Sequence, residues 1–315
     1  MSASKGRGPH RHATVRVPAK VNLELSVGPR RADGYHGVAT VFHAVSIYDI
    51  VTVEPAAEWG VVVEGPYADQ VPVDESNLAL RAARLVAGTG DVETPVRITI
   101  DKDIPVSGGM AGGSADAAAA LVACDALWGL ELSRPRLDEL AAELGSDVNF
   151  ALTGGTAIGS GRGEELTPVL TSGTYHWVFA VSEGGLSTPA VYDECDRLRD
   201  GHRVRRPETS DGLLAALRSG DPHSLAAALT NDLQEAAFSL RPPLRELLTT
   251  GLDMGALGGI VSGSGPTVAF LAADAEGALD LAVALAAVGT APEVKRATGP
   301  THGAHVLTHE MTRGS

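Results

Sequence analysis

The stretch D-I-P-V-S-G-G-M-A-G-G-S-A-D, residues 103–116, contains four glycines. A strand-like run, Val96 to Asp101, precedes it, and an alanine-rich run with the length of a buried helix, Ala115 to Trp128, follows it. A strand, a glycine loop and a helix start can bind phosphate, because the unpaired N–H groups approach an oxyanion closely. A tight turn selected for packing would have the same composition, so the loop alone does not establish a phosphate site.

This glycine loop differs from the two common nucleotide loops. A P-loop ends in Gly-Lys-Ser/Thr, whereas the chain has no lysine between Lys102 and Lys295. The dinucleotide fingerprint needs glycine at its first, third and sixth positions, and Met110 stands two residues after Gly108. Neither of those nucleotide-binding folds is therefore predicted.

Length and charge limit the possible functions. The 315 residues carry a net charge of −14, which argues against nucleic acid or an anionic membrane as partner. Cys124 and Cys195 are isolated and have no metal-ligand spacing, which is typical of a reducing cytoplasm. We expect a cytoplasmic enzyme that acts on small molecules.

Two segments outside the glycine loop carry candidate catalytic groups. Apolar and polar residues alternate along a predicted strand from Val15 to Val27, which places Lys20 and Asn22 on one face. Periodicity alone would make this an ordinary solvated face. Downstream, Ser146 predicts a helix N-cap, so that Asp147 lies in the first turn as a dipole partner or a catalytic carboxylate.

The remaining patterns indicate an α+β protein with two domains. A turn-rich loop, residues 28–37, presents Tyr35 and His36, and exposed loops often hold binding groups. We expect a disordered leader over residues 1–13, an N-terminal domain over 14–172, a C-terminal domain over 173–298 and a flexible tail over 299–315. A second glycine-rich loop, residues 262–266, should join two strands of the C-terminal domain.

Four features in this order resemble the GHMP kinase superfamily: P-A-K-V-N at 18–22, the glycine loop, G-S-D-V at 145–148 and S-G-S-G-P at 262–266. The segment R-R-A-D-G-Y-H, residues 30–36, resembles the branch that phosphorylates the 2-hydroxyl of a cytidylyl methylerythritol in the non-mevalonate route to isoprenoids. The resemblance covers residues 16–297. It implies an N-terminal domain like ribosomal protein S5 domain 2, a ferredoxin-like C-terminal domain and an active site between them.

The resemblance also implies roles for individual residues, with ATP and Mg²⁺ as cofactors. Lys20 and Asp147 would be catalytic, with Asp147 accepting the hydroxyl proton or orienting the hydroxyl. The ATP loop would comprise Pro105, Val106, Ser107, Gly108, Gly109, Met110, Ala111, Gly112, Gly113, Ser114 and Ala115, with Ser114 near the β-phosphate or Mg²⁺. Asn22, Tyr35, His36 and Tyr192 would bind substrate, and Gly263, Ser264 and Gly265 would close the phosphate side.

The loop departs from the usual pattern of the superfamily at four positions. That pattern has glycine at Ser107, leucine at Met110, glycine at Ala111 and a second serine at Ala115. The small replacements preserve a backbone cradle, but the lost serine removes one hydroxyl from the phosphate and Mg²⁺ shell. We expect a monomer or weak homodimer. A homoserine or mevalonate type of kinase and a catalytically silent ligand-binding relative remain alternatives.

Overall fold

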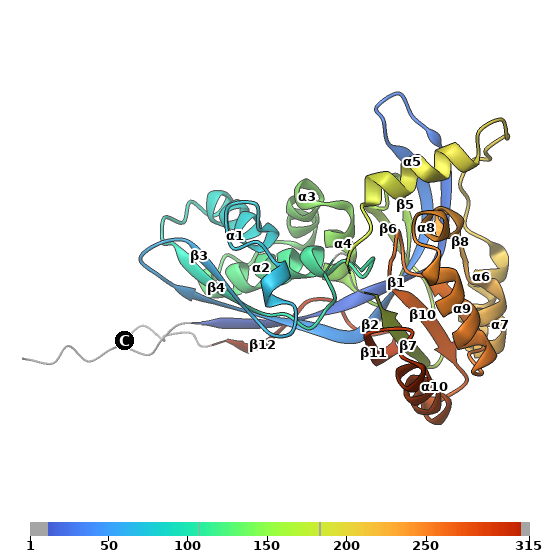
Figure 1. Ribbon diagram of the computed structural model, residues 1–315. Coiled ribbons are helices and arrows are strands. Elements are labelled where there is room, and N and C mark those ends of the chain that lie inside the picture. The colour runs from blue at the N-terminus through green and yellow to red at the C-terminus, as the bar shows by residue number, and fades with distance from the viewer. Residues whose placement is uncertain (1–11, 107, 183, 310–315) are drawn as a thin grey trace, which may run out of the picture.

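Two β-sheets adjoin in the computed structural model, which describes residues 12–106, 108–182 and 184–309 (Figure 1). The larger sheet has the order β12-β1-β2-β4-β3, with β5 added beside β2, β6 beside β5, and β8 beside β1. Its strands are β1 (Ala13–Arg30), β2 (His36–Pro55), β3 (Gly60–Glu64), β4 (Val96–Asp101), β5 (Thr156–Ser160), β6 (Glu165–Pro168), β8 (Thr230–Asn231) and β12 (His305–His309). The smaller, antiparallel sheet has the order β11-β7-β10-β9, formed by β7 (Tyr175–Val181), β9 (Gly258–Val261), β10 (Val268–Ala272) and β11 (Glu293–Gly299).

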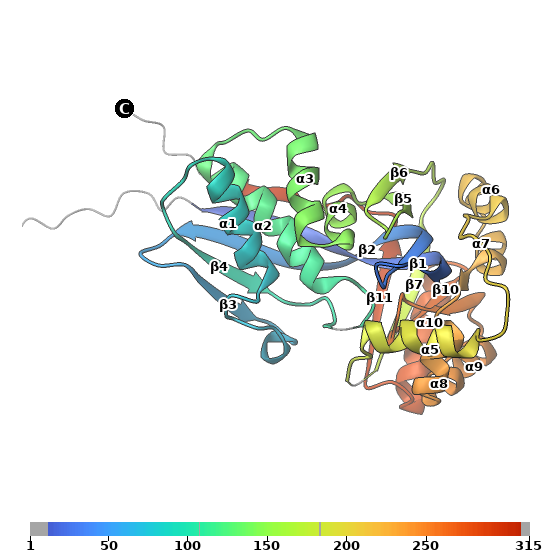
Figure 2. The ribbon, with the colours of Figure 1, turned by 90° about the horizontal axis from the view of Figure 1, so that it is seen from above.

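The helices divide between the two sheets (Figure 2). Four of them pack together over one face of the larger sheet: α1 (Leu78–Thr89), α2 (Gly112–Trp128), α3 (Arg134–Leu144) and α4 (Ser146–Thr153). The others lie on the side of the smaller sheet: α5 (Thr188–Leu198), α6 (Asp211–Ser219), α7 (Pro222–Ala228), α8 (Gln234–Leu240), α9 (Pro243–Asp253) and α10 (Ala275–Val288). A short 3₁₀ turn, η1 (Ala68–Gln70), precedes α1. No helix in the described part of the chain is long and apolar enough to cross a membrane.

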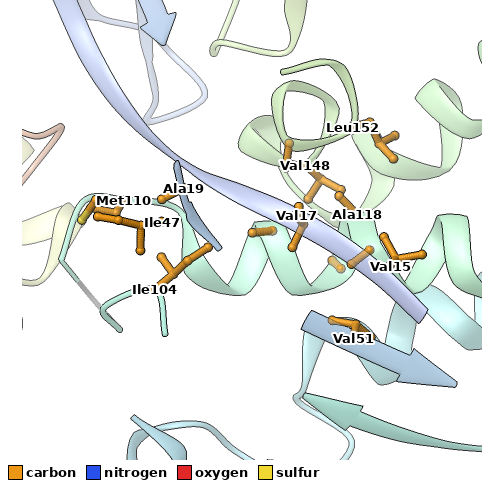
Figure 3. Packing of buried hydrophobic residues seen from close by; sticks show 14 of the residues in the cluster. Val15, Val17, Ala19, Ile47, Val51, Ile104, Met110, Ala118, Val148 and Leu152 are labelled. Carbon is orange, nitrogen blue, oxygen red and sulfur yellow. The ribbon is translucent and has the colours of Figure 1, made fainter. Parts of the chain in front are cut away.

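Helix α2 lies at the centre of the larger hydrophobic core. Its alanines from Ala115 to Ala123 are all fully buried, which is typical of a helix enclosed by other elements rather than lying at a surface. Figure 3 shows Val15 and Val17 of β1 near Ala118 of α2 and Val148 of α4, while Ala19 lies beside Ile47 and Met110. This packing fixes the start of α2, and therefore the glycine loop, against β1.

The ends of the described chain return to the larger sheet. Strand β12 pairs antiparallel with the start of β1, with Ala13 opposite His309. The predicted flexible tail is therefore wrong for residues 299–309, because β11 extends to Gly299 and β12 completes a sheet edge. The leader up to residue 11 and the tail from residue 310 lie outside the described residues, and Ala13 is already buried in β1.

The smaller sheet begins at Tyr175, close to the predicted domain boundary at residue 172. Two later segments nevertheless join the larger sheet, because β12 and β8 both pair with β1. The parallel pairing places Glu24 opposite Thr230, which brings the two halves of the chain together at the middle of β1. Candidate functional groups from both halves of the chain lie close together beside the middle of β1.

Candidate active site

The glycine loop joins β4 to α2 and makes a close contact with the second half of the chain. Gly109 has a φ of 76°, and a Cβ there would lie 1.9 Å from the carbonyl oxygen of Ser262. Ser262 Oγ donates a hydrogen bond of 2.9 Å to the carbonyl of Gly109. Glycine is therefore required at position 109 both by backbone conformation and by the approach of another loop.

Two other positions in the loop differ from the expected pattern. Ala111 is the N-cap of α2 and has a left-handed φ of 61°, a conformation that favours glycine. Met110 is fully buried, so its side chain belongs to the core, and its carbonyl accepts a 3.3 Å hydrogen bond from the Lys20 backbone. Ser107, one of the predicted ATP-loop residues, lies outside the described residues.

A buried charge cluster lies directly behind the loop. Lys102 Nζ pairs with the carboxylates of Asp49 and Asp116, and all three side chains are almost fully buried. The other oxygen of Asp49 accepts hydrogen bonds of 2.7 Å and 2.8 Å from the backbone N–H groups of Asp103 and Ile104. Burial alone would lower the pKa of Lys102, but the two aspartates outweigh it and raise that pKa. The cluster ties β2, β4 and α2 to the start of the loop.

The predicted phosphate-side loop faces the glycine loop from the second half of the chain. Asn231 Nδ2 donates hydrogen bonds of 2.8 Å and 2.7 Å to the carbonyls of Val261 and Gly263. The hydroxyls of Ser264 and Thr188 lie 2.9 Å apart. These contacts hold residues 261–264 opposite the start of α2.

The predicted catalytic pair lies between these loops. Lys20 Nζ is 3.8 Å from Asp147 Oδ2 and donates a 2.5 Å hydrogen bond to Asn22 Oδ1. Asn22 Nδ2 in turn donates to Thr40 Oγ1 at 2.8 Å. Lys20 and Asn22 are buried, so the predicted polar face of this strand is not a solvated one. The β-bulges at Pro18–Ala19 and Asn22–Glu24 shift the register of β1 around this pair.

Asp147 lies in the first turn of α4, as predicted, although Ser146 is not the cap. Gly145 is the N-cap, and Ser146 is the first helical residue. The Asp147 side chain is one-third exposed, whereas that of Lys20 is 7% exposed. Burial lowers the pKa of Lys20, and the nearby Asp147 carboxylate partly offsets that effect. The pair thus has a buried cation and an accessible carboxylate.

Two adjoining cavities lie beside this pair, which lines the first of them. One, of about 680 Å³, is lined by Lys20, Asn22, Asp147, Gly108, Gly109, Ala111, Gly112, Gly113, Ser114, Gly263, Ser264 and Gly265, among others. We call it the glycine-loop cavity. The other, of about 720 Å³, is lined by Tyr35, His36, Tyr192, Arg30 and Glu164, among others, and we call it the aromatic cavity. Val38, Arg162, Thr188, Pro189 and Tyr192 line both.

The aromatic cavity brings together the three predicted base-binding residues. The rings of His36 and Tyr192 are 5.0 Å apart and tilted by 32°. His36 Nε2 already pairs with Asp196 at 2.9 Å, so Asp196 fixes the ring. Tyr35 is 56% exposed at the cavity wall. Burial raises the pKa of Tyr192 to about 12, which keeps its hydroxyl protonated near neutral pH.

Comparison with known proteins gives the family. The profile of the GHMP kinases N terminal domain matches residues 77–157, and that of the GHMP kinases C terminal domain matches residues 213–291. The 4-diphosphocytidyl-2-C-methyl-D-erythritol kinase of Streptomyces avermitilis is 57% identical over 294 residues, which cover 93% of this chain and 99% of that protein. The enzyme of the same name from Thermobifida fusca is 58% identical and covers 93% and 98%.

The chain belongs to the 4-diphosphocytidyl-2-C-methyl-D-erythritol kinase family of the GHMP kinases. A crystal structure titled as a 4-(cytidine 5'-diphospho)-2C-methyl-D-erythritol kinase is 35% identical, with a TM-score of 0.74 and coverage of 90% of this chain and 98% of that one. The homoserine kinase of Cytophaga hutchinsonii, 19% identical with a TM-score of 0.72 over 97% and 100% of the chains, shares the fold. The prediction of a two-domain GHMP kinase fold is confirmed.

The charge cluster and three other supporting residues are absent from the sequence-based site. Asp49 could have been noticed, because it is the one charged residue in the mostly apolar run Val45 to Val53. Asp196 and Asn231 carry no local signal, since their partners lie 160 and about 30 residues away. Arg162 also escaped notice among the glycines of the β5–β6 turn.

Proposed function

We propose that this kinase transfers the γ-phosphoryl group of ATP to the 2-hydroxyl of 4-diphosphocytidyl-2-C-methyl-D-erythritol, a step of non-mevalonate isoprenoid precursor synthesis. One observation carries the proposal: the Lys20–Asp147 pair lines the glycine-loop cavity, and Ser146, the residue next to Asp147, lines the adjoining aromatic cavity. A phosphoryl donor in the first cavity and a nucleoside-bearing acceptor in the second would meet at that pair.

The glycine-loop cavity suits the triphosphate of ATP. Gly112 to Ala115 form the first turn of α2, whose unpaired backbone N–H groups carry partial positive charge. The cavity is walled on its opposite side by Gly263 to Gly265. We assign the ATP phosphates to the space between the first turn of α2 and Gly263 to Gly265. The Ser114 hydroxyl would contact the β-phosphate or its metal ion.

Mg²⁺ fits this donor set as an ion that arrives with the nucleotide. Within residues 12–106, 108–182 and 184–309, no group of three or more histidine, cysteine or acidic side chains could hold a metal ion. Mg²⁺ often binds through substrate phosphates and water with few protein ligands, and Ser114 lines the cavity. When bound, it would neutralise charge on the β- and γ-phosphates.

The chemistry assigned to the protein is proton acceptance and charge neutralisation. The substrate hydroxyl oxygen forms a bond to the γ-phosphorus, the bond from that phosphorus to the bridging oxygen of ADP breaks, and Asp147 takes the hydroxyl proton. Lys20 faces the carboxylate at 3.8 Å, so its ammonium group lies where it can offset charge on the transferred group. The side-chain amide of Asn22 is hydrogen-bonded through both its oxygen and its nitrogen, so we assign Asn22 to orienting Lys20 and bordering the acceptor.

The aromatic cavity suits the cytosine end of the acceptor. Base–aromatic stacking contributes about 1–3 kcal/mol per base, and Tyr35 offers an exposed ring at the wall. His36, held by Asp196, and Tyr192 form an aromatic pair that lines the same cavity. We also propose that the enzyme works in the cytoplasm as a monomer or weak homodimer, in keeping with its acidic composition and isolated cysteines.

A coupled ADP-release assay over three alcohols tests this function. The cytidylyl methylerythritol should be turned over with a kcat/KM at least about 100-fold above that of homoserine or mevalonate, because neither alcohol fills the aromatic cavity. Preference for homoserine or mevalonate would reassign the substrate. Binding of the cytidylyl compound without ADP release would instead identify a silent relative.

A further inference from the structure

We propose that Arg162 is a specificity-determining residue that binds the diphosphate of the acceptor substrate, at the junction of the two cavities. This inference rests on the proposed function, because it takes the acceptor to be a cytidine diphosphate ester. Such a molecule has its base at one end, its reacting hydroxyl at the other and two phosphates between. The phosphates must therefore lie where the aromatic cavity meets the glycine-loop cavity.

The position of Arg162 matches that junction. Lys20 lines the glycine-loop cavity and Arg30 lines the aromatic cavity, whereas Arg162 lines both. It stands in the tight turn between β5 and β6, where its backbone N–H donates to Glu164 at 2.6 Å. The carbonyl of the neighbouring Gly161 accepts a 3.0 Å hydrogen bond from Val38 of β2. The turn is thus fixed to the sheet, while the Arg162 side chain remains 44% exposed.

Among the described lysines and arginines that line these two cavities, the Arg162 side chain has the longest nearest polar contact. Arg30 is 3.0 Å from Asp193, and Lys20 is bonded to Asn22 and faces Asp147. Arg162, by contrast, is 3.4 Å from Asp33, an exposed carboxylate that Arg31 approaches more closely, at 3.1 Å. A dianionic diphosphate could take over the guanidinium without leaving Asp33 uncompensated, because Arg31 stays beside it. Guanidinium groups suit phosphate because their donors form a planar fork.

The electrostatic surroundings require such a cation. Three carboxylates, from Glu143, Glu164 and Asp193, line the aromatic cavity, and the whole chain carries a net charge of −14. A diphosphate would be repelled there unless a cation faced it. The Arg162 guanidinium also lies 3.9 Å from the centroid of the Tyr35 ring. The same side chain can therefore cover one face of Tyr35 and leave the other for the base.

Inhibition by cytidine and CDP separates phosphate binding from support of Tyr35. In the full-length enzyme, Arg162→Met should weaken competitive inhibition by CDP by about tenfold or more, because a hydrogen bond between charged groups is lost. The inhibition constant of cytidine, which has no phosphate, should change by less than about twofold. Arg162→Lys should recover part of the CDP affinity, because it restores the charge without the planar fork.

Arg31→Met is the matched control, since it removes the same charge beside the same Asp33 but does not line either cavity. It should leave the inhibition constant of cytidine within about twofold and raise that of CDP by less than about threefold, because solvent can compensate the exposed Asp33 that it leaves to Arg162. Equal losses for cytidine and CDP in Arg162→Met, or an equal loss of CDP affinity in both variants, would overturn the proposal.

Direct calorimetry keeps this inference separable from the proposed function. If CDP binds the wild type more tightly than cytidine and Arg162→Met removes that difference, Arg162 binds the diphosphate even if turnover of the cytidylyl alcohol fails. If CDP binds the wild type no more tightly than cytidine, the inference about Arg162 is overturned, whatever the turnover.

Discussion

Replacing Lys102 with methionine removes the cation that pairs with both Asp49 and Asp116 behind the glycine loop. The side chain is 1% exposed, so solvent cannot compensate for its loss. Removing one partner from a buried ion pair costs about 3–5 kcal/mol, because the remaining charge stays buried and unpaired. We expect a loss of that size in the free energy of unfolding, which is a large share of the total stability of a domain.

The loss in free energy of unfolding of Lys102→Met should depend on pH, and the buried carboxylates determine the direction of that dependence. Burial raises the pKa of Asp116 well above its ordinary value, and Lys102 partly offsets that rise. In Lys102→Met the pKa of Asp116 in the folded state rises further, so the folded protein favours the protonated carboxyl. The loss in free energy of unfolding therefore grows as pH increases through that folded-state pKa. The stability difference between wild type and variant should therefore be larger at about pH 8 than at about pH 5.

Urea unfolding followed by circular dichroism measures this effect, with Lys295→Met as control. Lys295 also pairs with two carboxylates, Asp103 at 2.6 Å and Glu293 at 3.1 Å, but Asp103 is 48% exposed. The control should lose less than about 1 kcal/mol. A similar loss in both variants, or a loss in Lys102→Met that stays constant with pH, would refute the reasoning about the buried cluster.

Three further changes test other parts of the site. Gly109→Ala should raise the KM for ATP by about tenfold or more, because the added Cβ would meet the Ser262 carbonyl. Gly88→Ala is the control and should leave that KM unchanged, because a Cβ there has nothing within 4 Å. Equal KM values for ATP in the two variants, measured by steady-state kinetics, would contradict this. Ala111→Gly should raise the free energy of unfolding by about 0.5–1 kcal/mol, because it removes the backbone strain of an alanine in the left-handed region. A lower melting temperature in this variant would count against that strain. Tyr35→Ala should raise the KM for the cytidylyl substrate about tenfold and leave that for ATP within about twofold, and equal rises would remove Tyr35 from the base site.

The sequence predicted the parts of the site that depend on local patterns. The glycine loop, the alternating strand with Lys20 and the helix start with Asp147 each have a local signature, and the structure brings Lys20 and Asp147 to 3.8 Å. The strand periodicity correctly placed Lys20 and Asn22 on the same face of the strand, but it predicted a solvated face where the structure has a buried one. Gly263, from the other half of the chain, lies against the buried Lys20 and Asn22 side chains, a contact that periodicity within one strand cannot show.

What the sequence did not reveal depends on contacts between distant segments. Strand β12 forms because it pairs with β1, nearly three hundred residues earlier in the chain. From the sequence alone, such a short strand at the end of the chain looks like a flexible tail. The N-cap of α4 was misplaced by one residue, because serine is the commoner cap and Gly145 takes the position here. The roles of Asp49 and Arg162 appear only after folding brings their partners together.

The turnover of Asp147→Asn tests the central claim most directly. With saturating ATP and the cytidylyl methylerythritol, its kcat should fall by at least about 100-fold, because asparagine cannot accept the hydroxyl proton. The Kd for ATP should stay within about twofold of the wild type. Asp138→Asn on neighbouring α3, a surface carboxylate paired with Arg134, should retain full turnover. A wild-type kcat in Asp147→Asn would contradict the assignment of phosphoryl transfer to the Lys20–Asp147 pair.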